Sequence, residues 1–141
     1  AERVTLEGTV RYFYDEVRRT LHRELERAVE VARALGAEAE LEIRAGYPPV
    51  VNDESMTALL ERAGAEALGG GEVERIAPML LAEDFGILAR EAPGSFAWLG
   101  AAPEDPREHH HPKFDVDESA LVRGASTLAA CALQALREIG S

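Results

Sequence analysis

Three consecutive histidines, His109, His110 and His111, are the residues of this chain best suited to chemistry. They are three of the four histidines in 141 residues, and carboxylates flank them on both sides. Neutral imidazole is the commonest protein ligand of zinc and related metals. Adjacent side chains of an extended segment point to opposite sides, so the three cannot all bind one ion, and Pro112 favours an extended backbone at His111. On spacing alone, the tract fits a solvated loop or a fortuitous metal-binding segment as well as a functional site.

Periodicity predicts the elements that position this tract. A short buried strand at 95–99 precedes it, and a helix from Asp117 to about Ile139 follows it. In that helix Gly124 and neighbouring alanines favour close approach to a sheet. Cys131 is the one cysteine of the chain, which excludes an internal disulfide framework, and we expect it to be a small core residue of this helix.

The first half of the chain predicts a strand, a helix and a second strand in succession. Alternating apolar residues indicate strands at 4–13 and 38–44, and apolar spacings of three and four indicate a helix at 15–35 that Gly36 ends. Pro48 and Pro49 exclude a helix and mark a boundary. The elements predicted after this boundary are a helix from about residue 53 to Leu68, a short strand at 73–76 and a short helix at 83–90.

Composition narrows the class of protein. Apolar residues make up 46% and charged residues 29%, which suits a globular domain. The net charge of −11 argues against nucleic-acid partners and against docking on anionic membranes. No apolar run approaches the roughly 20 residues of a spanning helix, and no signal peptide is visible. A cytoplasmic location fits these features.

Several short motifs resemble, in the same order, those of the metal-dependent amidohydrolases and aminoacylases, the group that includes hippurate hydrolase and the N-acyl-amino-acid amidohydrolases. Each motif alone is weak, whereas their common order is a strong signal. The motifs are L-E-G-T-V-R at 6–11, P-P-V-V-N-D at 48–53, A-E-D-F at 82–85, P-G-S-F-A-W-L-G-A at 93–101 and H-H-P-K-F-D-V-D-E-S-A-L at 110–121. The pattern departs from the family at Leu81, where a glycine is usual.

The resemblance implies an α/β fold class in two domains. Residues 1–47 would be the strand-helix-strand part of a ferredoxin-like α+β lid, or dimerisation, domain. Residues 48–141 would supply the C-terminal helices and strands of a zinc-peptidase-like α/β catalytic domain. The chain therefore looks like the C-terminal portion of a longer enzyme, and we expect a homo-oligomer formed through the lid piece.

For the intact enzyme, the resemblance implies a metallopeptidase-like hydrolase that cleaves the amide bond of a small N-acyl amino acid. Two divalent ions, Zn, Mn or Co, would activate a water and polarise the carbonyl. The family's general base and most of its metal ligands lie in an N-terminal half whose motifs are absent here. No catalytic residue is therefore expected in this chain, and the chain alone should be inactive.

Two groups of residues acquire roles from the resemblance, each with a plainer alternative. His110 matches the family's C-terminal metal ligand, whereas His111 fills a variable slot and His109 matches no family position. Glu83 and Asp84 match a turn whose carboxylate could orient a ligand histidine, or they cap the following helix.

Asn52 and Arg11 are candidate substrate contacts. For Asn52 the alternative is a helix cap, and for Arg11 it is a cross-strand ion pair. The alternative for the whole chain is a non-catalytic dimerisation or binding module with an adventitious histidine-rich metal site.

Overall fold

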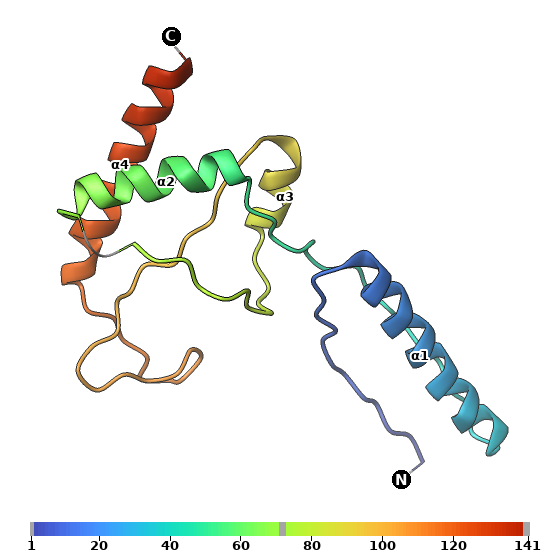
Figure 1. The fold of residues 1–141 in the computed structure, drawn as a ribbon. Coiled ribbons are helices and arrows are strands. Elements are labelled where there is room, and N and C mark those ends of the chain that lie inside the picture. The colour runs from blue at the N-terminus through green and yellow to red at the C-terminus, as the bar shows by residue number, and fades with distance from the viewer. Residues whose placement is uncertain (1, 71–72, 140–141) are drawn as a thin grey trace. The chain divides into compact units, whose positions relative to one another are not determined.

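The structure, a computed structural model, describes residues 2–70 and 73–139 (Figure 1). Its four helices are α1 at Asp15–Ala34, α2 at Glu54–Ala67, α3 at Phe85–Glu91 and α4 at Ser119–Ile139. Each lies where the apolar periodicity predicts a helix. The chain divides into two compact units: unit 1 comprises Ala1–Val50 and Ala77–Leu88, and unit 2 comprises Val51–Ile76 and Ala89–Ser141. The predicted domain division between residues 47 and 48 stays a prediction.

The end of α1 follows from one glycine. Gly36 has a φ of +91°, a left-handed conformation that costs a glycine little. The Gly36 N–H donates to the Arg33 carbonyl at 2.9 Å, and the Ala37 N–H donates to the Ala32 carbonyl at 3.1 Å. This is the Schellman arrangement, which satisfies two carbonyls of the last turn and ends the helix.

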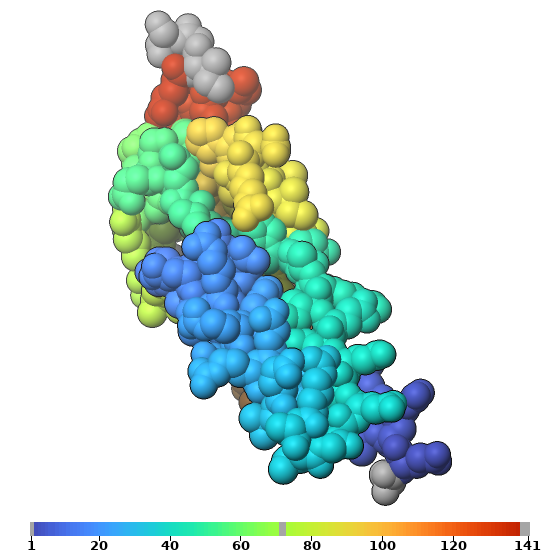
Figure 2. All heavy atoms as spheres, turned by 90° about the vertical axis from the view of Figure 1, so that its right-hand side faces the viewer, coloured from blue at the N-terminus to red at the C-terminus, as the bar shows by residue number. Residues whose placement is uncertain are grey.

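The predicted α/β fold class is wrong, because the described part of the chain contains four helices and no strand. Segments 4–13, 38–44, 73–76 and 95–99 are not strands. An alternating pattern indicates extended backbone, but a strand also needs a neighbour to complete a hydrogen-bonded ladder. Segment 38–44 instead lies beside α1 (Figure 2), where the Arg33 guanidinium donates to the Ala39 carbonyl at 2.9 and 2.6 Å.

In unit 2, α2 and α4 pack against each other through small side chains. The buried apolar residues are Leu59 and Ala63 of α2 and Ala120 of α4. Gly64 permits this approach, since a Cβ there would lie 3.7 Å from Thr127 of α4 and 2.8 Å from Val73.

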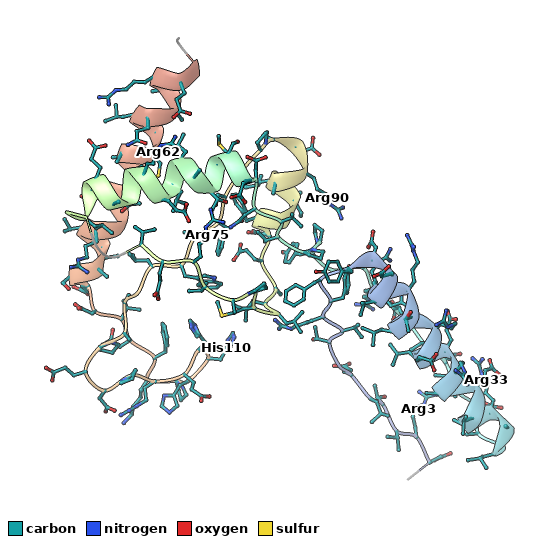
Figure 3. All side chains as sticks on the ribbon, in the orientation of Figure 1. Arg3, Arg33, Arg62, Arg75, Arg90 and His110 are labelled. Atoms are coloured by element: carbon teal, nitrogen blue, oxygen red, sulfur yellow. The ribbon has the colours of Figure 1, made fainter. Side chains whose placement is uncertain are left out.

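Ion pairs join α2 to α4 and to the segment that follows α2. Arg62 of α2 pairs with Glu138 of α4 at 2.7 Å, and Arg75 pairs with Glu61 and Glu54 of α2 at 2.5 and 3.1 Å (Figure 3). The Arg75 contacts hold the extended segment 73–76 against α2. These pairs are exposed and screened by solvent, so each contributes little to stability.

The helix α4 corrects the expectation that no apolar run is long enough to span a membrane. Its residues Ser119–Glu138, 20 in number with a mean hydropathy of 1.2, are long and apolar enough to cross one. Length and composition alone also fit the core helix of a soluble protein.

Candidate functional site

The histidines lie on a loop, residues 102–116, whose two ends are joined (Figure 3). The Asp117 N–H donates to the Ala101 carbonyl at 2.9 Å, which closes the loop in the manner of an Ω-loop. The Asp117 carboxylate then accepts the N–H of Ser119 at 2.9 Å and its hydroxyl at 2.8 Å, and these bonds start α4. The loop is therefore anchored to the helix that follows it.

Two successive turns shape the histidine tract. The His111 N–H donates to the Glu108 carbonyl at 3.1 Å, and the Phe114 N–H donates to the His111 carbonyl at 2.9 Å. His110 occupies the third position of the first turn with a φ of +70°, the one left-handed non-glycine residue in the described part of the chain. Several turn types require this conformation at that position, and histidine tolerates it better than most residues. The sequence-based expectation of a simple extended tract missed this turn.

The three imidazoles differ in what they contact. His111 accepts the Lys113 N–H at its Nδ1, at 3.0 Å. His109 stacks on Phe114 with ring centroids 5.2 Å apart and planes inclined by 28°. Within residues 2–70 and 73–139, no hydrogen bond or ring contact engages the imidazole of His110. His110 is thus the loop histidine whose ring has neither a stacking partner nor a hydrogen bond in the described part of the chain.

The described residues do not form a metal site by themselves. No group of three or more His, Cys, Asp or Glu side chains lies close enough together in this part of the chain to hold an ion. A structural zinc needs four ligands and a catalytic zinc about three. One imidazole from this loop can supply only one of them.

Asn52 pairs with the backbone of Phe96. Its Nδ2 donates to the Phe96 carbonyl at 2.9 Å, and its Oδ1 accepts the Phe96 N–H at 2.9 Å. Beside this pair, the Asp53 N–H donates to the Gly94 carbonyl at 2.9 Å, and the hydroxyls of Thr57 and Ser95 lie 3.1 Å apart. We call this set of contacts the Asn52 clasp. It holds segment 94–96 against the start of α2.

Asn52 and Asp53 are both candidates for the cap of α2, and the structure places Asp53 in that role. The Asp53 carboxylate accepts the N–H groups of Ser55 and Met56 at 2.9 and 3.0 Å. The Ser55 hydroxyl, followed by these backbone donors, lowers the pKa of Asp53 below its ordinary value. In the same way, Ser119 lowers the pKa of Asp117 at the start of α4. The sequence signal for both caps is an acidic residue two positions before a serine.

The other predicted residues, Arg11, Glu83 and Asp84, belong to unit 1. The Arg11 guanidinium donates to the Leu80 carbonyl at 3.1 Å. Glu83 Oε1 accepts the Phe85 N–H at 3.3 Å, and the Asp84 carbonyl accepts the Ile87 N–H at 2.8 Å. Glu83 thus caps the start of α3 with its side chain, whereas Asp84 contributes its backbone carbonyl. The roles that the resemblance implies for Glu83 and Asp84 stay predictions.

Two surface hollows are lined by residues outside the histidine loop. One, of about 620 Å³, lies between α1 and residues 41–43. The other, of about 510 Å³, lies between residues 51–54 and 89–94, beside the Asn52 clasp. His110 lines neither hollow.

The sequence profile of peptidase family M20/M25/M40 matches residues 3–134. The chain belongs to this family. The match covers both units and the whole histidine loop. It confirms, at the level of the family, the resemblance to the amidohydrolases on which the sequence-based function rests.

Individual M20/M25/M40 relatives are similar over nearly the whole chain but are much longer. A Bacillus subtilis protein named as an amidohydrolase, YhaA, is 36% identical over 137 residues, which are 94% of this chain and 35% of the relative. The N-acetyl-L-cysteine deacetylase of the same species is 34% identical over 123 residues, 86% of this chain and 29% of the relative. A crystal structure described as that of an aminohydrolase of methicillin-resistant Staphylococcus aureus is 31% identical to this chain, with a TM-score of 0.69. The match covers 85% of this chain and 32% of the crystallised one. The chain thus spans about a third of the length of these relatives.

Proposed function

We propose that the chain is part of an amidohydrolase that cleaves N-acyl amino acids, and that His110 is its contribution to a divalent-metal centre. The observation that carries the proposal is the difference among the loop histidines. The rings of His109 and His111 have structural partners, whereas the ring of His110 has none within the described residues. Membership of the M20/M25/M40 family supports a hydrolase, and the names of two relatives support amide and N-acetyl substrates.

The metal and the general base lie beyond what the described residues can supply. Because no three donors lie together in this part of the chain, the remaining ligands of a centre with two Zn, Mn or Co ions would come from other polypeptide. When bound, such ions would supply a polarised carbonyl and an activated water. We therefore keep the prediction that the chain alone is inactive.

Asn52 has a positioning role in this proposal. Both polar atoms of its amide are used by Phe96, so it would act by holding segment 94–96 in place. Arg11 remains the better candidate for a substrate carboxylate, since its guanidinium has five donors and its hydrogen bond to the Leu80 carbonyl uses one of them. Glu83 and Asp84 would orient the site only as far as they fix the start of α3.

The test is reconstitution with the portion of YhaA that this chain does not match. The chain and that portion are co-expressed, purified with added zinc, manganese or cobalt, and assayed on N-acetyl amino acids. We expect turnover by the pair and none by the chain alone. His110→Ala should lower turnover by about a hundredfold or more and reduce the metal content measured by mass spectrometry.

His109→Ala is the matched control, since it removes a neighbouring imidazole that stacks on Phe114. It should retain most of the turnover and the metal. Turnover by the purified chain alone would overturn the assignment, and so would a reconstituted pair that hydrolyses no N-acyl amino acid. If His109 is the sensitive position, the role given to His110 is wrong. Metal binding without hydrolysis would favour the alternative of a non-catalytic module.

A further inference from the structure

The ring of His111 is bonded to the backbone two residues further along the chain. The Lys113 N–H donates to His111 Nδ1 at 3.0 Å, and the Phe114 N–H donates to the His111 carbonyl at 2.9 Å. Pro112 has no N–H of its own. His111 therefore accepts, with its ring and its carbonyl, both N–H groups that the three following residues carry.

This ring forms a local turn of a kind typical of other side chains. Asparagine, aspartate, serine and threonine commonly accept the backbone N–H two positions later. One nitrogen of a neutral imidazole carries a proton and the other accepts one. Since Nδ1 of His111 accepts the Lys113 N–H, the proton of the neutral ring lies on Nε2. A metal ligand must instead offer a free lone pair, so this ring is unsuited to bind an ion while the turn is closed.

The two turns of the loop meet at His111. It is the last residue of the first turn, in which its N–H donates to the Glu108 carbonyl at 3.1 Å, and it is the first residue of the second turn. His110 directly precedes it with a φ of +70°. Such a conformation costs free energy in most residues other than glycine, and it persists only where the surrounding structure enforces it. The hydrogen bonds of His111 are the contacts adjacent to His110 that can enforce it.

Burial does not set the shape of this loop. Residues 104–119 are all exposed in the described part of the chain. The shape therefore depends on hydrogen bonds within the loop and on the stacking of His109 on Phe114. The turn that His111 closes ends at Phe114, so it also places that ring where His109 stacks on it.

We infer that His111 is a positioning residue for His110. By closing the turn over Pro112, its ring holds the neighbouring backbone and so limits the directions in which the His110 ring can point. This inference rests on the proposed function, in which His110 is the metal ligand. A ligand that is already ordered loses less conformational entropy on binding, so loss of the turn should weaken metal binding without removing a donor.

Three substitutions separate this role from direct metal binding by His111. His111→Asn keeps an acceptor that can reach the Lys113 N–H. His111→Gln carries the same amide group on a side chain one methylene longer, which does not form this local turn, so it is the matched control. His111→Ala has no acceptor. If His111 bound the metal itself, all three variants would lose binding alike, because neither an amide nor a methyl group replaces an imidazole.

Solution NMR of the isotopically labelled 141-residue chain measures the turn directly. Ring nitrogen shifts should show wild-type His111 with its proton on Nε2 at a pH where imidazole is neutral. The Lys113 amide should exchange with water about threefold more slowly in the wild type and His111→Asn than in the glutamine and alanine variants. A strong NOE between the amide proton and Hα of His110, the mark of a positive φ, should be present in the first pair and weak in the second.

Zinc affinity tests the functional consequence. It is measured by competition with a chelator, on the chain reconstituted with the portion of YhaA that it does not match. We expect the glutamine and alanine variants to bind zinc about tenfold more weakly than the wild type, and His111→Asn to bind it as the wild type does. Saturating zinc should restore turnover in the weakened variants, because they keep His110.

The inference is overturned if the glutamine or alanine variant keeps the slow Lys113 exchange and the His110 NOE, or if His111→Asn loses them. It is also overturned if all three variants bind zinc equally, whether as tightly as the wild type or more weakly. Failure of the proposed function gives a different result. A zinc content that His110→Ala leaves unchanged would refute that function, whereas the NMR series would still decide whether His111 holds the turn.

Discussion

Gly86, in the first turn of α3, lies against the backbone of the two prolines that precede α2. A Cβ at this position would lie 2.5 Å from the Pro48 carbonyl oxygen and 3.2 Å from that of Pro49. Ordinary contacts of a Cβ begin near 3.4 Å, so the Gly86→Ala methyl would overlap the Pro48 oxygen by roughly 0.9 Å. The obstructing atoms are backbone atoms of residues whose φ angles are fixed by their rings, so they cannot move cheaply.

Two effects of Gly86→Ala oppose each other. Alanine is favoured over glycine in a helix by at most about 1 kcal/mol. Overpacking against an unyielding neighbour costs about 1–3 kcal/mol. Since the overlap is large and involves backbone, we expect the second effect to win and the free energy of unfolding of unit 1 to fall by about 1–2 kcal/mol.

Gly124→Ala is the matched control, because it has the opposite expected sign. Its Cβ would lie 2.8 Å from Leu99 Cδ2, the end of a side chain that is 46% exposed and free to rotate. Helix propensity should then dominate and leave the stability unchanged or raised by up to about 1 kcal/mol.

Urea unfolding followed by far-UV circular dichroism compares the two variants, and hydrogen exchange assigns any loss of stability to unit 1 or unit 2. If Gly86→Ala proves as stable as Gly124→Ala, the Pro48–Gly86 contact does not constrain the protein and the reasoning fails.

Two further substitutions test the loop and the clasp. Asn52→Ala removes two side-chain hydrogen bonds of 2.9 Å to Phe96 and should lower the free energy of unfolding of unit 2 by about 1–2 kcal/mol. Trp98 fluorescence during urea unfolding measures the change. An unchanged urea midpoint would mean that water replaces these hydrogen bonds without loss of stability. At His110, with a φ of +70°, the glycine variant should be about 0.5–1 kcal/mol more stable than the alanine variant, and equal stabilities would argue against the left-handed turn.

The helices could be predicted from the sequence because their information is local. Apolar spacing, acidic first turns and Gly36 fixed the position of α1 without reference to the rest of the chain. The predicted strands are wrong because the alternation in residues 4–13 indicates an extended segment with two different faces but does not identify the segment that lies beside it. In the described part of the chain, that neighbour is not a second strand.

The candidate site was only partly predictable. Motif order singled out His110, but what distinguishes it in the structure is the contacts of its two neighbours. His109 stacks on Phe114, and the Lys113 N–H donates to His111. The seven-residue spacing of Leu121 and Leu128 likewise places both side chains on one stripe of α4. It could not tell whether that stripe packs inside the described units or faces outward, because both arrangements need the same spacing.

The two acidic caps, Asp53 and Asp117, give the stability of unit 2 a defined dependence on pH. Hydrogen bonds from serine hydroxyls and backbone N–H groups hold the pKa of each carboxyl below its ordinary value of 3.8 in the folded protein. A depressed folded pKa means that the unfolded chain binds protons more readily, so the stabilisation is complete above about pH 4 and is lost as the pH falls through the folded value. The difference in free energy of unfolding between the wild type and Asp53→Asn should therefore become smaller only below about pH 4. Urea midpoints measured from pH 7 to pH 3 test this, with Asp105→Asn, an exposed acid outside both caps, as the control. A difference that already declines between pH 7 and pH 5 would show that another group, and not the cap carboxylate, controls the acid sensitivity.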